Sequence, residues 1–184
     1  IEDANFTFDD YCENAPGSPV LDPFATLGGT FSFTTPPAGS ETINPTSGVI
    51  TGGVGGSAYD VTYQTLGACA DASSETVTVV SSPLAFAGLD SEVCAGLSHT
   101  IIGATSTNSS SFMWTSSGTG TFAFGNTLTP SYTPSSLDIS SGSVILTLTA
   151  IGNTPCTYAT SSMVLTIPSF IPLGVILFQF SPPS

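Results

Sequence analysis

Four cysteines, one histidine and thirteen carboxylates are the residues of this chain whose chemistry could define a site. Cys12 and Cys69 are separated by nearly the same length of chain as Cys94 and Cys156, and no CxxC pair or Cys/His cluster points to a metal. Four cysteines allow three pairings, and the similar spacing, with Pro83 between the pairs, favours one disulfide in each half. Two long-range disulfides predict an oxidising, extracellular setting.

The acidic side chains crowd the N-terminus, where no Lys or Arg is present to neutralise them. Ca²⁺ prefers oxygen ligands, so a calcium site is one interpretation, and a solvated acidic face without EF-hand spacing is the alternative. The candidate ligands are Glu2, Asp3, Asp9, Asp10 and Glu13, and a second set is formed by Asp90, Glu92 and Asp138. Calcium is the one cofactor that these residues suggest.

A net charge of -13 without a single Lys or Arg excludes several functions. Nucleic-acid binding needs cations to neutralise phosphates, and Schiff-base lysines or phosphate-cradling loops with their lysine are ruled out by the same composition. Paired carboxylates could hydrolyse glycosides, but the sequence marks no groove with supporting residues. His99, within "LSHTII", is expected at the surface where a strand begins. We therefore predict no enzyme and no catalytic residues.

Short alternating strands are predicted along most of the chain, with almost no helix. In the first half they cover residues 5–8, 30–33, 58–65 and 75–80, with a turn at 45–48 between Ile43 and Val49. In the second half they cover residues 100–102, 111–115, 120–124, 128–132, 143–150 and 163–167. The halves echo each other, since each has an early cysteine, a Gly-Thr-Phe, a long alternating strand and a late cysteine.

The pattern predicts an all-β chain of two tandem, disulfide-closed Ig-like β-sandwich domains with a C-terminal extension strand. The first domain is expected over residues 1–82 and the second over residues 83–167. Residues 168–184 are expected to form a linker and an apolar strand.

Several segments resemble repeats of the very large surface adhesins of gliding Bacteroidetes-type bacteria. "YCENAPGSP", "LGGTFSFT", "INPTSGVI" and "YDVTYQT" resemble one kind of repeat, of the PKD-like type. "AGLDSEVCAG", "FMWTSSGTGTF", "YTPSSLDISSGSVILTLTA" and "NTPC" resemble a second, immunoglobulin-like repeat. The resemblance covers about residues 4 to 167. It implies disulfide-closed sandwiches strung as stalks on secreted filaments or adhesins, with no catalytic residues to carry over.

The apolar stretch near the C-terminus is too short to span a membrane, because Pro172 and Gly174 interrupt it and a spanning helix needs about 20 apolar residues. Its β-branched and aromatic residues favour a strand that needs cover on both faces. Such a strand could be donated to a neighbouring subunit or could begin a third domain. The predicted assembly residues are Phe170, Val175, Ile176, Leu177, Phe178 and Phe180.

These observations predict a non-enzymatic structural module of an extracellular filament or surface adhesin, joined head to tail by β-strand donation. Its expected partners are neighbouring identical or similar modules, with neither nucleic acid nor a membrane span. The alternative is a carbohydrate-binding module of a secreted protein, with Trp114 stacking on a sugar. Trp114 is expected in the core, as in immunoglobulin domains, and exposure of its ring would favour the alternative.

Overall fold

The computed structural model describes residues 2–168 of the 184-residue chain, and the predicted assembly strand at 170–180 lies outside them. The described residues are nearly all β, which confirms the predicted class. The first half contains β1 (Phe6–Phe8), β2 (Tyr11–Cys12), β3 (Pro19–Leu21), β4 (Thr30–Phe33), β5 (Thr42–Ile43), β6 (Ile50–Thr51), β7 (Ala58–Gln64) and β8 (Ala72–Val80). The second half contains β9 (Leu84–Phe86), β10 (Ser91–Glu92), β11 (His99–Thr100), β12 (Thr105–Thr107), β13 (Ser109–Ser116), β14 (Thr121–Ala123), β15 (Ser131–Thr133), α1 (Ser136–Ser141), β16 (Ser143–Gly152) and β17 (Tyr158–Thr166).

The first half is built on a four-stranded sheet in the order β2-β8-β7-β4, accompanied by the pairs β1-β3 and β5-β6. Strand β7 alternates as predicted, so Tyr59, Val61 and Tyr63 are buried while the residues between them face outward. The predicted turn at 45–48 is confirmed, because β5 and β6 flank it and Ile43 pairs with Ile50.

The second half repeats this plan with the sheet β10-β17-β16-β13, a three-stranded sheet β11-β15-β14 and the pair β12-β9. Val144, Leu146 and Leu148 point inward from β16, as the sequence predicted. In both halves a short early strand runs parallel to the last strand, β2 with β8 and β10 with β17.

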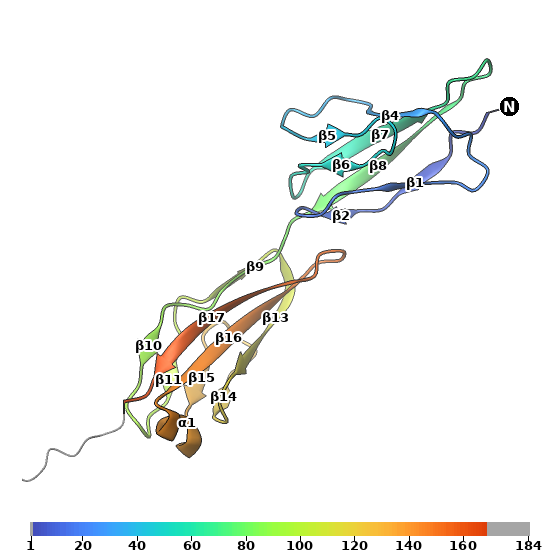
Figure 1. Ribbon diagram of the computed structural model, residues 1–184. Helices are drawn as coiled ribbons and strands as arrows, with labels where there is room; N and C mark the ends of the chain where they lie inside the picture. The colour runs from blue at the N-terminus through green and yellow to red at the C-terminus, as the bar shows by residue number, and fades with distance from the viewer. Residues whose placement is uncertain (1, 169–184) are drawn as a thin grey trace, which may run out of the picture.

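The buried apolar residues form two separate clusters, one drawn from residues 4–79 and the other from residues 87–167. Figure 1 shows the halves arranged end to end, with the chain crossing once between β8 and β9. Pro83 lies in this crossing, between Val80 and Leu84. The clusters fall on either side of the predicted boundary, and the division into two domains stays a prediction.

The Gly-Thr-Phe motif occurs in both halves for the same structural reason. The amide of Gly29 donates to the hydroxyl of Tyr63 at 2.9 Å, and Phe31 pairs with the same tyrosine across β4 and β7. Likewise, the amide of Gly120 donates to the Tyr132 hydroxyl at 3.0 Å. A Cβ on either glycine would lie 2.6 Å from its tyrosine ring, so the motif needs glycine.

Two local predictions differ from the structure. The strand predicted at 100–102 is observed as β11 over His99–Thr100, and the chain turns soon after it at Gly103, which has a φ of 78°. The helix α1 was not predicted, since six residues are too few to show a helical period. It is fixed instead by a capping box between Ser135 and Asp138.

Candidate functional site

The junction between the halves is closed by a disulfide between Cys12 and Cys156, whose Cα atoms are 4.9 Å apart. Cys12 ends β2 in the first half, and Cys156 lies in the turn between β16 and β17 in the second. The bond therefore joins residues separated by 144 positions. The predicted pairing within each half is wrong, because Cys69 and Cys94 are free and exposed.

Ser82, in the crossing segment, is held from both halves. From the first half, the Asn14 amide donates to the Ser82 hydroxyl at 2.8 Å, and a Glu13 carboxylate oxygen accepts from the Ser82 amide at 3.2 Å. From the second half, the Asn108 side chain donates to the Ser82 carbonyl at 3.1 Å. These bonds fix the backbone beside the disulfide, so the crossing segment is not a free linker.

A cavity of about 450 Å³ lies beside the bond. Its walls come from both halves and include Asn14, Ser82, Pro83, Pro155 and Tyr158. They carry no acid, base or nucleophile other than hydroxyl groups, since Cys12 is already bonded.

The structure does not bring the five predicted calcium ligands together. Glu2 accepts from the Gly67 amide at 3.1 Å, Asp3 from the Asn5 amide at 2.9 Å, and Asp10 from the Thr78 amide at 2.7 Å. The Glu13 carboxylate accepts from the Ser82 amide at the junction, and Asp9 is exposed to solvent. Residues 2–168 contain no group of three or more His, Cys, Asp or Glu that could hold a metal ion. Glu2, Asp3, Asp10 and Glu13 each accept a hydrogen bond from a backbone amide.

Asp138, which the sequence offered as a calcium ligand, is a buried structural acceptor. It is 3% exposed and accepts from the amides of Thr119, Gly120 and Ser135 and from the Tyr132 hydroxyl, all at 2.8 to 2.9 Å. Burial alone would raise the pKa of this carboxyl, but the hydrogen bonds outweigh burial and hold its pKa below the ordinary value. The Ser-x-x-Asp spacing that starts α1 was the sequence signal for this role.

Trp114 lies in the core of the second half, as predicted. It is 7% exposed, its indole N–H donates to the Thr127 carbonyl at 3.1 Å, and its ring packs beside Phe122. The ring therefore presents no free face to a sugar, so Trp114 does not support the carbohydrate-binding alternative. Cys156 bonds to Cys12, so the immunoglobulin arrangement of a tryptophan on a bridge within its own domain is absent from the described residues.

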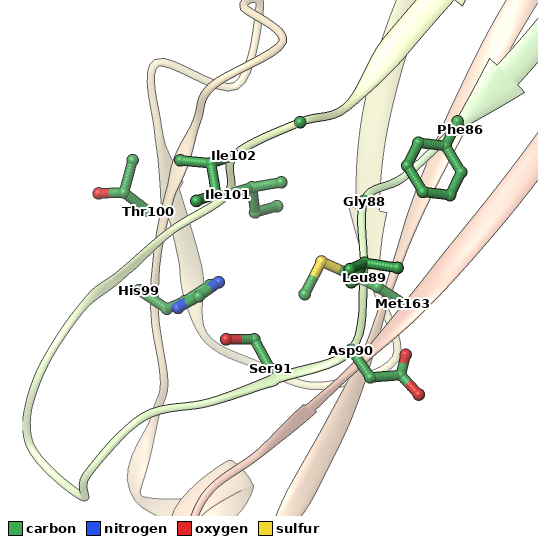
Figure 2. A pocket seen from close by; sticks show the side chains of 11 residues that line it. Phe86, Gly88, Leu89, Asp90, Ser91, His99, Thr100, Ile101, Ile102 and Met163 are labelled. Atoms are coloured by element: carbon green, nitrogen blue, oxygen red, sulfur yellow. The ribbon is translucent and has the colours of Figure 1, made fainter.

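An apolar cavity of about 450 Å³ lies between the segments 86–91 and 99–103, as Figure 2 shows. Leu89, Ile102 and Met163 line it, and His99 contributes its ring from the start of β11. Partial burial lowers the pKa of His99 below its ordinary value, which favours a neutral imidazole. Asp90 lies at the rim, where its carboxylate accepts from the Val164 amide at 2.7 Å. No catalytic pair is formed by these side chains.

Among the described residues, no helix is long and apolar enough to cross a membrane.

No protein-family model and no curated protein matches the chain. Solved structures that resemble it include Drosophila N-cadherin EC1-3, at 15% identity and a TM-score of 0.38 over 91% of this chain and 66% of that one. The insect immune protein hemolin is similar at 13% identity and a TM-score of 0.45, over 89% and 46% of the two chains. Mouse Cadherin-23 EC22-24 is similar at 15% identity and a TM-score of 0.34, over 92% and 66%.

The chain thus spans less than two thirds of the length of these structures. All three neighbours consist of cadherin or immunoglobulin-like repeats. At such low identities and TM-scores the likeness assigns no family and no activity. The resemblance to bacterial surface adhesins stays a prediction.

Proposed function

We propose that the chain is a non-enzymatic structural module of an extracellular filament or surface adhesin. The observation that carries this proposal is the disulfide between Cys12 and Cys156, which ties one hydrophobic core to the other. The bond restricts the orientation of two bodies that, within residues 2–168, are joined by one backbone crossing, and a stalk or filament requires such a restriction.

The extracellular location that we propose rests on the same disulfide. Disulfides persist in secreted and cell-surface proteins and are rare where thiols are kept reduced. The surface of the chain carries Ser, Thr and carboxylates but no Lys or Arg, so it has no attraction for phosphates or nucleic acid. We therefore place the module outside the cell or on its surface.

The proposal includes head-to-tail joining by donation of residues 170–180 as a strand to the neighbouring module. Its support is the sequence of this segment, which lies outside the described residues. Burying about five large apolar side chains gives about 7 to 15 kcal/mol gross, which is comparable to the cost of ordering the backbone. A receiving sheet edge adds ladder hydrogen bonds and tips the balance towards association.

Assembly of the purified full chain, followed by electron microscopy and sedimentation, tests this function. We expect end-to-end assemblies, and we expect deletion of residues 168–184 to leave single modules. In the full-length chain, Ile176→Asp combined with Phe178→Asp should act like the deletion. Gln179→Asp, on the opposite face of the predicted strand, should be the tolerated control.

The competing outcome is that the segment fills the apolar cavity around Leu89 and Ile102 in its own chain. The deletion would then leave assembly unchanged and would open that cavity to an apolar fluorescent dye. Assemblies of normal length without residues 168–184 would contradict strand donation.

A further inference from the structure

The turn between β7 and β8, which contains Cys69, and the segment that follows β10, which contains Cys94, lie at opposite ends of the molecule (Figure 1). Cys69 is in the turn between β7 and β8, where the Gly67 amide donates to Glu2, close to the point at which the chain enters the first half. Cys94 follows β10, where the Val93 amide donates to the Thr166 carbonyl at 3.0 Å, close to the point at which the chain leaves the second half. Both thiols are exposed.

Cys94 lies near the place in the second half that Cys12 occupies in the first. It is two residues farther along the chain, because Glu92 pairs with the end of β17 as Cys12 pairs with the end of β8. Cys12 ends the short strand that runs parallel to β8, and the next amide, of Glu13, donates to the Val80 carbonyl at 2.9 Å. Cys94 lies just beyond the short strand that runs parallel to β17. We call these two residues the early cysteines.

Cys69 and Cys156 are equivalent in the same way, and we call them the late cysteines. Each lies in the turn between the last two strands of its half, β7 and β8 or β16 and β17. Each turn also contacts the chain that enters its half. For Cys156 this contact is with Val80, whose carbonyl oxygen is 3.4 Å from the sulfur, and for Cys69 it is made through Glu2.

The internal disulfide thus joins the early cysteine of one half to the late cysteine of the half that follows it. The same early-to-late pairing, applied at the two ends of the molecule, joins Cys94 to a late cysteine of a following half and Cys69 to an early cysteine of a preceding half. Both of these cysteines are unpaired in the described structure and face outward at the correct ends.

We propose that Cys94 forms a disulfide with Cys69 of the next module in a head-to-tail array, repeating the bond between Cys12 and Cys156. This inference rests on the proposed head-to-tail function and names the covalent contact at each joint. The partner is a half with the same fold that exposes a late cysteine. It is supplied by a second copy of this chain or by a module that continues the same polypeptide.

The bond forms by two thiol–disulfide exchanges with a small-molecule disulfide as the oxidant. The Cys94 thiolate attacks the oxidant, forming a mixed disulfide and releasing one small thiolate. The Cys69 thiolate of the neighbour then attacks the Cys94 sulfur and releases the second. Two protein thiols are oxidised and one small disulfide is reduced to two thiols, so the electrons and protons balance.

Exposed apolar side chains accompany both thiols. Leu66, three residues before Cys69, is 69% exposed, and Leu97, three residues after Cys94, is 60% exposed. Because contacts between the ends would cover them, these side chains fit surfaces that meet another module.

The test uses the Cys69→Ser and Cys94→Ser variants, which leave the internal disulfide intact. Each variant is incubated with oxidised glutathione and then run on a non-reducing gel. Each alone should stay monomeric, because it keeps one kind of free thiol, whereas their equimolar mixture should give dimers at least about tenfold above either alone, since docked ends raise the effective concentration. The wild-type chain should give a ladder, and peptide mapping should identify a Cys69–Cys94 link.

A tandem fusion of two copies distinguishes the sources of the partner. A Cys94–Cys69 link in the fusion but not between separate chains assigns the joint to one continuous polypeptide. Equal dimer formation by each single variant, or no such link in either format, would overturn the proposal. Assemblies that form in microscopy without this bond would overturn it while leaving the proposed function standing.

Discussion

Cys12 and Cys156 face each other across the junction, with the hydroxyl of Ser82 3.4 Å from the Cys12 sulfur. Within residues 2–168 this bond and the chain crossing at residues 81–83 are the two covalent links between the cores. If either half unfolds while the other stays folded, the bond closes a loop through the unfolded half. The disulfide therefore restricts the unfolded states of both halves and also orients the folded ones.

We predict that Cys12→Ser combined with Cys156→Ser lowers the stability of each half by about 4 kcal/mol, the loop-closure value for an unfolded loop of roughly 70 residues. Chemical unfolding monitored by far-ultraviolet circular dichroism measures this change. Small-angle scattering should also show a broader range of overall lengths, because the orientation is less restricted. Cys69→Ser combined with Cys94→Ser is the matched control and should change neither quantity in the monomer.

The acid sensitivity of the second half should depend on Asp138. Its folded pKa lies below the ordinary value of 3.8, so its contribution is fully present above that value and is lost as the pH falls through the folded pKa. Asp138→Asn should cost about 2 to 3 kcal/mol near neutral pH, because an amide cannot accept all the surrounding N–H groups. The difference from wild type should shrink below pH 3.8.

Unfolding curves at several pH values, followed by the fluorescence of Trp114, measure this effect in the half that contains both residues. Asp60→Asn is the control, since Asp60 is exposed and bonds to Thr76 at the surface of the first half. A constant difference between wild type and Asp138→Asn across acid pH would contradict the proposed hydrogen-bonded carboxylate.

The glycines of the two Gly-Thr-Phe motifs should resist substitution. Gly29→Ala and Gly120→Ala should each destabilise their own half by about 1 to 3 kcal/mol. The added methyl group would meet the backbone carbonyl of Gln64 or Thr133 and also the ring of Tyr63 or Tyr132. Thermal unfolding measures the loss. Gly125→Ala is the control, since its nearest contact would be an ordinary 3.4 Å from Phe122. Equal effects at all three positions would argue against the tyrosine contact.

Trp114 should behave as a core residue. Its emission should lie at short wavelength in the folded chain and shift to longer wavelength when the second half unfolds. Trp114→Ala should cost about 3 to 5 kcal/mol through loss of core packing. Glycan-array binding by the wild-type chain that is lost in Trp114→Phe, with the fold preserved, would revive the sugar-stacking alternative.

The strands were predictable because alternation is a local signal. Tyr59, Val61 and Tyr63 appear at every second position, and a sheet with one buried face requires this pattern. Two-residue strands such as β10 carry no such pattern, since tertiary pairing with β17 defines them. The Gly-Thr-Phe echo was visible in the sequence, but its cause was not, because the tyrosine that accepts the glycine amide is distant in the chain.

The disulfide pairing could not be obtained from spacing. When two halves share a plan, early and late cysteines recur at similar intervals whether each bond stays within a half or crosses to the next. Spacing therefore identifies equivalent positions and says nothing about which pairs bond. Distance in the folded chain decides. Cys12 lies at the junction beside Cys156, whereas the turn between β7 and β8, which contains Cys69, lies at the far end of the first half (Figure 1).

Mapping the disulfide in the native, non-reduced chain tests the central claim most directly. The chain lacks Lys and Arg, so trypsin cannot be used, and pepsin at acid pH both cleaves it and suppresses disulfide exchange. We predict a linked peptide pair containing Cys12 and Cys156, with Cys69 and Cys94 open to alkylation in the monomer. Linked pairs of Cys12 with Cys69 and of Cys94 with Cys156 would contradict the account.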